Sequence, residues 1–144
     1  PRECSLYLVR DGATPAWESF PKGGCWIIRV RKRNTLIDRL WEELCFACVG
    51  ELFGIPDVVC VAVSTRARED VLSVWSKDNS SHFAIGEKLK ELLNLDESTQ
   101  VDYKTFRHAI QDGSSFKNAK SYVYSQPSQQ AVKLPAVFVT TDKQ

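Results

Sequence analysis

The sequence predicts an α+β fold in which a mostly antiparallel β-sheet carries helices on one face. Segments with strand character outnumber segments with helix character, and most of the connections between them are of hairpin length. The 144 residues, of which 43% are hydrophobic, are enough for one domain with a buried core. No internal repeat is present, so each element is expected from its own residue pattern.

Two strands joined by a loop are expected at the start of the chain. Residues 4–9 have strand character, and residues 13–24 hold two prolines and two glycines without periodicity, which is typical of a loop. Residues 25–33 alternate between an apolar face and a face that carries Ile27, Arg29 and Arg31. This alternation predicts a half-buried strand with one solvated face.

The clearest helix is expected over residues 35–53. Thr35 and Asp38 form a pair similar to a capping box, and Gly54 and Pro56 follow the expected end. Apolar residues recur at three- and four-residue steps and define a core face, made of Ile37, Leu40, Trp41, Leu44, Cys45, Cys48 and Leu52.

The rest of the chain is expected to add strands and one more helix. A valine-rich strand over 58–66 and a strand over 71–76 form a hairpin, and a second helix covers 82–94. The remaining expectations are, in order, a short strand near Val101, a polar loop over 111–120, a strand over 121–124 and a tail rich in Gln, Ser and Pro.

Charge and composition restrict the function. Nineteen basic and eighteen acidic residues give a formal charge of +1, without the basic excess of a protein that coats nucleic acid. Any anion should therefore bind at a small, discrete cluster. No apolar run reaches membrane-spanning length, and no signal peptide opens the chain. Five cysteines, an odd number, favour a reducing cytoplasm over a disulfide scaffold, with the nucleus left open as a second compartment.

Enzyme chemistry is not expected. Cys45 and Cys48 form a C-x-x-C pair, but it lies on the apolar face of the expected helix and has no second pair beside it. His82 and His108 have no ligand-like spacing, and no nucleotide-binding or nucleophile motif is present. The sequence therefore predicts no metal, no cofactor and no catalytic residue. An enzyme that uses one of the two thiols is a remote alternative, and it requires a thiol accessible to alkylation.

Trp17 and Glu18 form the first candidate binding pair. They lie in a loop bounded by Pro15 and Pro21, where no strand or helix face is available to bury an indole. One interpretation is a loop anchor packed against the core. The other is a stacking plate with a carboxylate beside it, which accepts the adjacent N1–H and amino donors of guanine. Methylation at N7 makes that base cationic and adds about 0.5–2 kcal/mol of cation–π attraction.

Arg66 and Arg68 form the second candidate. In an extended chain, residues two apart project to the same side, so two guanidinium forks could hold a di- or triphosphate. The competing interpretation is a solvated hairpin end, with Glu69 and Asp70 neutralising the pair.

The outward face of the 35–53 helix is the third candidate. Phe46 is a large apolar residue on an otherwise polar stripe, and Gly50 follows one turn later. A glycine inside a helix costs about 1 kcal/mol relative to alanine, so close approach of a partner backbone would explain it. A single exposed aromatic residue without a role is the competing interpretation.

Four motifs in this order resemble the cap-binding translation initiation factor 4E family. They are W-E in a loop, G-G-C-W opening a strand, L-W-E-E-L-C-F-A-C-V-G-E on a helix, and T-R-A-R before a strand that ends in Trp75. The similarity runs from Ser5 to Tyr124. It implies a curved sheet with helices on the convex face and a slot on the concave face that holds a 7-methylguanosine cap.

The resemblance also implies a role for each matched residue. Trp17 stacks on the base, Glu18 pairs with the guanine edge, and Trp75 contacts the methyl group. The residues implied at the cap phosphates are Arg66 and Arg68, with Lys117 and Lys120 as further cations. The helix face that receives a scaffold initiation factor or a repressor peptide is implied to consist of Trp41, Glu42, Glu43, Phe46 and Gly50.

Several positions depart from the family pattern. Val71 stands where the family usually has a phosphate-binding lysine, and Gln111 falls near another. Glu42 replaces an apolar contact on the helix face, so the partner of this chain is expected to differ at that position. The two family strands and the helix that precede the matched region, with a first stacking tryptophan, are absent from this sequence, so we expect the native protein to be longer. We expect a cap-binding domain over residues 1–124 and a C-terminal extension over 125–144.

The sequence thus predicts a non-enzymatic protein that binds capped mRNA in translation initiation or its regulation. The alternative is an interaction scaffold of the same fold with weak or lost cap binding. Retention on immobilised 7-methyl-GTP separates these two hypotheses.

Overall fold

The fold is taken from a computed structural model that describes residues 3–32, 36–96, 99–124 and 138–141. Its elements, in chain order, are β1 (Cys4–Val9), η1 (Trp17–Ser19), β2 (Gly24–Arg31), α1 (Leu36–Val49), β3 (Val58–Thr65), β4 (Glu69–Ser76), η2 (Asn79–Ser81), α2 (His82–Leu93), β5 (Gln100–Thr105), α3 (Phe106–Asp112), β6 (Lys120–Tyr124) and β7 (Phe138–Thr141).

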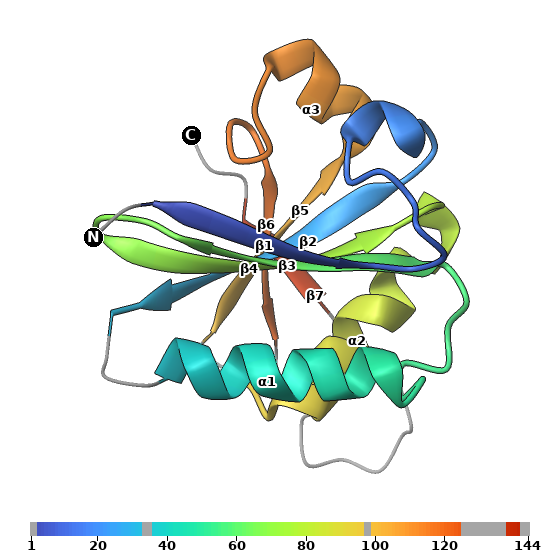
Figure 1. Ribbon diagram of the computed structural model, residues 1–144. Coiled ribbons are helices and arrows are strands. Elements are labelled where there is room, and N and C mark those ends of the chain that lie inside the picture. The colour runs from blue at the N-terminus through green and yellow to red at the C-terminus, as the bar shows by residue number, and fades with distance from the viewer. Residues whose placement is uncertain (1–2, 33–35, 97–98, 125–137, 142–144) are drawn as a thin grey trace, which may run out of the picture.

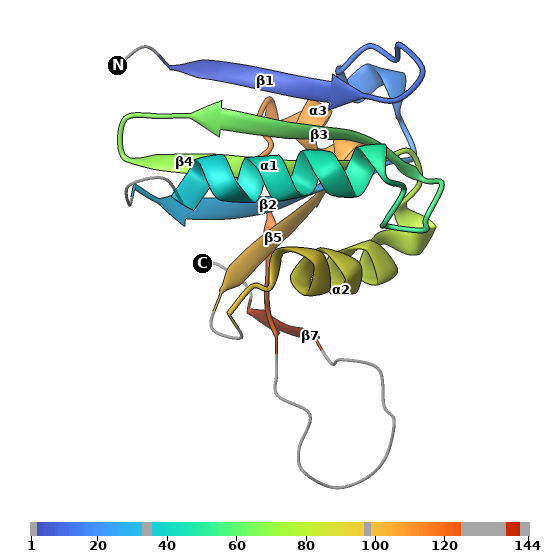
Figure 2. The ribbon, with the colours of Figure 1, turned by 60° about the horizontal axis from the view of Figure 1, so that its bottom comes forward.

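The strands form one sheet in the order β1-β3-β4-β2-β5-β6-β7. Every pairing in it is antiparallel, which confirms the predicted sheet type. Figure 1 shows α1 and α2 on one side of this twisted sheet, and Figure 2 shows the two helices together from below. The predicted α+β class is therefore confirmed.

Each central strand contributes side chains to two apolar clusters, because successive side chains point to opposite faces of the sheet. Trp26 and Ile28 belong to the large cluster under α1 and α2, whereas Cys25 and Ile27 belong to a smaller cluster on the opposite face. The expectation of a solvated second face for β2 is therefore wrong over its first half. Loops cover that half, and the arginines begin only at Arg29.

Trp26 is the centre of the helix-side core. It is 1% exposed, and its indole N–H donates to the carbonyl oxygen of His82 at 2.8 Å. A Cβ added at Gly86 would lie 2.6 Å from the Trp26 ring, so α2 comes this close to the sheet only because that position has no side chain. Trp26 and Gly86 together fix the distance between α2 and the sheet.

Helix α1 ends at Val49, earlier than predicted. Glu51 takes a left-handed conformation with φ 55°, and the N–H of Leu52 donates to the carbonyl oxygen of Ala47, as in a Schellman motif. Arg10 holds Glu51 there through two hydrogen bonds of 2.6 and 2.9 Å. Leu52 is consequently 54% exposed, and its predicted place on the core face is wrong. The predicted cap residue Thr35 lies outside the described residues.

A short helix, α3, was not expected. The side-chain oxygen of Thr105 accepts from the N–H of His108 at its start, and Gly113 ends it with φ 63°. The predicted polar loop over 111–120 is therefore shorter, because residues 111 and 112 belong to α3. Figure 1 shows α3 beside η1, on the side of the sheet opposite α1 and α2, and α3 packs against η1.

The hairpin between β3 and β4 also differs in detail from the prediction. Strand β4 begins at Glu69, and residues 66–68 form the turn. At the far edge of the sheet, β7 pairs with β6, so part of the predicted extension 125–144 joins the sheet. The boundary at residue 124 stays a prediction.

Within the described ranges, no helix is both long enough and apolar enough to cross a membrane. The same ranges contain no cluster of three or more His, Cys, Asp or Glu side chains that could hold a metal ion.

Candidate functional site

A hollow of about 520 Å³ opens on the face of the sheet opposite α1 and α2. We call it the concave hollow. Its floor comes from β2, β3 and β4, and its walls come from β1, the loop before β2 and the loop after α3. The lining residues are Ser5, Tyr7, Pro15, Ala16, Trp17, Glu18, Cys25, Ile27, Ala62, Ser64, Arg66, Val71, Ser73, Trp75, Gly113, Ser114, Ser115 and Phe116.

The predicted base-binding residues all line this hollow. Trp17 and Glu18 enter from η1, and Trp75 enters from β4, 58 positions later in the chain than Trp17. The sheet register explains the meeting, because Trp75 lies opposite Cys25, close to the loop that carries η1. The fold thus brings together three side chains that the sequence could only associate by resemblance.

Trp17 combines the two interpretations that the sequence left open. It is half-buried and packs against the small concave cluster, and it also lines the hollow. The one-turn helix η1 holds it, because the N–H of Phe20 donates to the Trp17 carbonyl oxygen at 3.1 Å. Glu18 is exposed and has no hydrogen-bond or ion-pair partner within the described part of the chain. Its carboxylate is therefore available to a ligand.

Trp75 is more deeply placed than Trp17. It is 6% exposed, its ring centroid lies 4.8 Å from that of Phe106, and Tyr7 contacts it edge-on at 6.1 Å. Its indole N–H donates to the hydroxyl of Ser73 at 3.2 Å. Since Trp75 is buried, contacts two aromatic rings and already donates its N–H within the protein, it can offer a ligand only a small apolar contact.

Of the predicted phosphate-binding residues, only Arg66 lines the concave hollow. The Arg66 guanidinium carbon lies 4.1 Å from the centre of the Phe116 ring, in cation–π geometry. Arg68, Lys117 and Lys120 are exposed outside the hollow. The expectation that Arg66 and Arg68 project together fails because residues 66–68 form a turn and not an extended strand.

Sequence reasoning missed Lys104, which holds the loop that carries Phe116. Lys104 is 3% exposed, and its ammonium donates to the Asp112 carboxylate at 2.8 Å and to the Ser114 carbonyl oxygen at 2.7 Å. It also donates to the carbonyl oxygen of Lys117. The hydrogen bond from Lys104 lowers the pKa of the Asp112 carboxyl group. The sequence offers no pattern that singles out Lys104, because β5 reads QVDYKT and already contains polar residues beside Lys104.

The outward face of α1 and the turn that follows it carry a broader apolar patch than predicted. Phe46 is 64% exposed, Val49 76% and Leu52 54%, and we call these three residues the helix patch. Among the other predicted partner-binding residues, Glu42 and Gly50 are exposed, Glu43 is half-buried, and Trp41 packs against the core. Gly50 follows the last residue of α1, and the positive φ of the turn falls on Glu51 and not on Gly50. A Cβ added at Gly50 would lie 3.0 Å from the carbonyl oxygen of Phe46, so a side chain there would be crowded within the chain itself, without a partner.

The cysteines give no support to the thiol-enzyme alternative. All five are free, and burial raises the pKa of Cys48 to about 11 and also raises the pKa of Cys45. A thiol with a raised pKa stays protonated at neutral pH and is a weak nucleophile. Cys25 and Cys60 are buried, with pKa values raised by burial to about 12.

The sheet, the two helices behind it and the concave hollow define a class of protein, an α+β binding domain with an aromatic and basic site on the open face of the sheet. The family model described as eukaryotic initiation factor 4E matches residues 1–121. The chain belongs to the eukaryotic initiation factor 4E family, which confirms the resemblance drawn from the four motifs.

Relatives among curated proteins agree with this assignment. A eukaryotic translation initiation factor NCBP from Oryza sativa subsp. japonica is 37% identical over 124 residues, which cover 82% of this chain and 54% of that protein. Eukaryotic translation initiation factor 4E-4 from Caenorhabditis elegans is 35% identical over 122 residues, which cover 81% of this chain and 57% of that protein. The chain therefore spans about half the length of these relatives.

Two solved structures share the fold. The eIF4E-3 of C. elegans, in a complex with the 4E-binding protein Mextli and a cap analog, superposes with a TM-score of 0.68 and 28% identity, covering 74% of this chain and 65% of that chain. The Ascaris suum eIF4E-3 in a complex with the m7G cap gives a TM-score of 0.65 and 30% identity, covering 70% and 61% of the two chains.

Proposed function

We propose that this protein binds the 7-methylguanosine cap of mRNA in the concave hollow and acts, without catalysis, in translation initiation or its regulation. The observation that carries the proposal is that one hollow gathers Trp17, Glu18, Trp75 and Arg66. The cap complexes of the related C. elegans and Ascaris suum proteins support the same ligand class.

The base fits the end of the hollow formed by the loop before β2. Stacking on Trp17 is worth about 1–3 kcal/mol, and the positive charge of N7-methylguanine adds cation–π attraction. Glu18, which has no partner within the described residues, can accept from the two adjacent donors on the guanine edge. Trp75 closes the inner end with a small apolar contact.

The phosphates fit the opposite end, where Arg66 enters the hollow. Phe116 limits the movement of the guanidinium group, so that less conformational entropy is lost when it binds a phosphate. The floor beneath it is apolar at Val71, which is buried and offers no charge. We therefore propose Arg66 as the principal phosphate contact, with Arg68, Lys117 and Lys120 contributing only long-range attraction.

Retention on immobilised 7-methyl-GTP tests the proposal. The protein should be retained and should elute with free cap analogue but not with GTP. Glu18→Gln should reduce this discrimination, because an amide places its own NH₂ against one guanine donor, at a cost of roughly 1–3 kcal/mol. Glu42→Gln makes the same change on the opposite face and should bind as the parent does. Elution by GTP as readily as by the cap analogue would contradict the proposal.

The helix patch favours a second role in binding a protein partner. Phe46, Val49 and Leu52 form an exposed apolar surface beside Glu42. We propose that an amphipathic helix with apolar and basic residues, from a scaffold initiation factor or a repressor peptide, packs on it. The complex of C. elegans eIF4E-3 with Mextli supports a 4E-binding protein as the partner class. A scaffold without useful cap binding stays the alternative, and it predicts this interaction without retention on 7-methyl-GTP.

A further inference from the structure

The concave side-chain row of β2 changes from apolar to basic as it leaves the concave hollow. Cys25 and Ile27 line the hollow, and residues two apart in a strand share a face, so Arg29 and Arg31 continue the same row. The Arg29 guanidinium carbon lies 5.7 Å from the ring centre of Phe116, the ring that also contacts Arg66. The basic part of the row therefore begins at the proposed phosphate end of the hollow.

Strand β2 extends beyond its neighbour β5 at this end of the sheet. Its pairing with β5 reaches Ile28, whereas its pairing with β4 continues to Arg31. A second hollow of about 760 Å³ opens here, and we call it the end hollow. Its lining includes leucines of α1 and α2 together with Arg29, Arg31, Arg39, Thr99 and Gln100.

The end hollow has cations available to an anionic ligand. Arg31 and Arg39 are exposed and make no ion pair within the described part of the chain. Arg29 lies 3.5 Å from the Asp102 carboxylate and 3.9 Å from that of Glu69, so its pairing is loose. The acids Asp96 and Asp102 also line the hollow, and both already have interaction partners.

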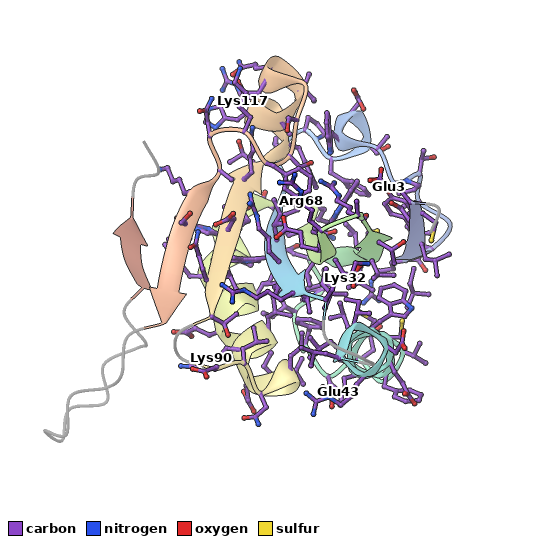
Figure 3. All side chains as sticks on the ribbon, turned by 90° about the vertical axis from the view of Figure 1, so that its left-hand side faces the viewer. Glu3, Lys32, Glu43, Arg68, Lys90 and Lys117 are labelled. Carbon is purple, nitrogen blue, oxygen red and sulfur yellow. The ribbon has the colours of Figure 1, made fainter. Side chains whose placement is uncertain are left out.

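Further basic residues flank this end of the molecule. Figure 3 looks onto it and places Arg68 between Lys117, toward the concave side, and Lys32, toward the helices. Lys32 is paired with Asp70 at 2.5 Å, whereas Arg68 is exposed without an ion pair among the residues described. The basic surface thus extends from the concave hollow around the end of the sheet.

We propose that the RNA nucleotides that follow the cap leave the concave hollow along Arg29 and Arg31, and that the end hollow receives the first of them. This inference rests on the proposed cap-binding function. With the base at Trp17 and the phosphates at Arg66, the chain must continue toward the end of β2 that carries the arginines. Arg29 and Arg31 are about 6.6–6.8 Å apart along the strand and offer consecutive contacts to phosphates. Thr99 and Gln100 offer polar groups to a ribose or a base.

An acidic peptide is the competing occupant of the end hollow. It would satisfy Arg31 and Arg39 equally well by charge alone. The continuity of the arginine row with the concave hollow favours RNA. A capped RNA whose cap is bound in the concave hollow can contact Arg29 and Arg31 with its next phosphates, whereas a separate acidic peptide gains nothing from this continuity. The apolar surface of the leucines is compatible with packing against the face of a base or against a ribose.

The test compares affinities for 7-methyl-GTP and for capped mono-, tri- and pentanucleotide RNAs at several salt concentrations. Affinity of the parent protein should rise as nucleotides are added. When the salt concentration is raised fourfold, this gain in affinity should fall roughly threefold for each additional phosphate contact. Arg31→Ala and Arg39→Ala should remove the gain but leave 7-methyl-GTP affinity unchanged. The matched control is Arg107→Ala, an exposed arginine of α3 outside both hollows, which should keep the gain.

Three results would overturn the inference while leaving cap binding intact. The first is equal affinity for 7-methyl-GTP and for every capped RNA. The second is that Arg107→Ala also abolishes the rise in affinity with RNA length, which would show that this rise depends on net charge and not on the end hollow. The third is binding of an acidic peptide of matched charge that depends on Arg31 and is unaffected by capped RNA. Failure of 7-methyl-GTP itself to bind would instead overturn the proposed function.

Discussion

The two faces of the sheet are made by the same strands but are covered in different ways. On the convex face, α1 and α2 bury a continuous cluster that includes Trp26, Leu44 and Leu89. On the concave face, a smaller cluster around Trp75 and Phe106 is covered by loops and α3, and a hollow stays open beside it. Stability therefore depends mainly on one face, and the other face can hold polar, partly exposed side chains at little cost to folding.

This division of roles predicts that substitutions on the two faces will have separable effects. A change under the helices should lower the free energy of unfolding and leave the affinity of folded molecules unchanged. A change in the concave hollow should lower the affinity for the ligand and leave the free energy of unfolding nearly unchanged. The predictions that follow test this separation, from the largest expected effect to the smallest.

Leu44→Ala should cause the largest loss of stability. Leu44 is fully buried between α1 and the sheet, and removing its methyl groups leaves a cavity that costs about 2–5 kcal/mol. Urea unfolding measures this loss, and titration with 7-methyl-GTP on the folded fraction should give the parent affinity. Leu44→Met keeps the volume and should cost less than about 1.5 kcal/mol. A reduced affinity in folded Leu44→Ala molecules would show that the two faces are coupled.

Lys104→Met tests the place where the concave face has a buried polar structure of its own. The substitution leaves the Asp112 carboxylate and the loop carbonyl oxygens without their common donor, which should cost about 1–3 kcal/mol of stability. Cap affinity should also fall, because the loop that positions Phe116 and Arg66 loses its anchor. The matched control is Lys88→Met on α2, whose ion pair with Glu91 is exposed. Unchanged affinity in Lys104→Met would show that the loop is held by other contacts.

The same ion pair has a defined pH dependence. Lys104 lowers the pKa of the Asp112 carboxyl group below its ordinary value of 3.8. The pair therefore contributes its full stability above that value and loses it as the pH falls through the lowered pKa. Asp112→Asn should remove this acid-side loss, which thermal unfolding between neutral and acidic pH will measure.

Local patterns predicted the strands and the two long helices well. The alternation of β2 placed Trp26 correctly, and the apolar period of α1 placed Leu44, because each depends on its own neighbours along the chain. Helix α3 was missed because seven residues carry too little periodicity, and the end of α1 was misplaced because Arg10, far away in sequence, holds the left-handed Glu51.

The residues of the candidate site could be predicted only where they belong to a recognisable sequence motif. Trp17 and Glu18 were identified from their loop, and the resemblance supplied Trp75. The contact between Arg66 and Phe116 depends on a loop whose path is fixed by Lys104, so no local pattern could indicate it. For the same reason, the sequence could not distinguish Arg66, which enters the hollow, from Arg68, which does not.

Trp17→Ala should separate binding from stability on the concave face. Loss of the stacking plate should weaken 7-methyl-GTP binding by about tenfold or more, given about 1–3 kcal/mol per stacked base. Stability should fall less than in Leu44→Ala, because Trp17 is only half-buried. Trp17→Phe keeps an aromatic face and should lose less affinity than the alanine variant. Calorimetric titration measures both variants, and parent affinity in Trp17→Ala would exclude Trp17 as a stacking residue.

The smallest expected effect concerns the helix patch, which lies on the stable side of the molecule yet is exposed. Phe46→Ala removes the largest apolar group of the patch without touching the core, so stability and cap affinity should both stay unchanged. Binding of an amphipathic helical peptide that carries apolar residues and flanking lysines should weaken by about 1 kcal/mol or more, as expected of an aromatic anchor.

Glu42 decides what kind of partner this patch prefers. An apolar partner side chain packed against its carboxylate would carry a desolvation cost, whereas a lysine or arginine there would be attracted. Glu42→Leu should therefore tighten binding of a peptide with an apolar residue at that point and weaken binding of the lysine-flanked peptide. The measurement is peptide affinity by fluorescence anisotropy, with 7-methyl-GTP affinity followed in parallel. If Phe46→Ala and Glu42→Leu leave both peptides unaffected, the partner surface does not include the helix patch, and the convex face serves stability alone.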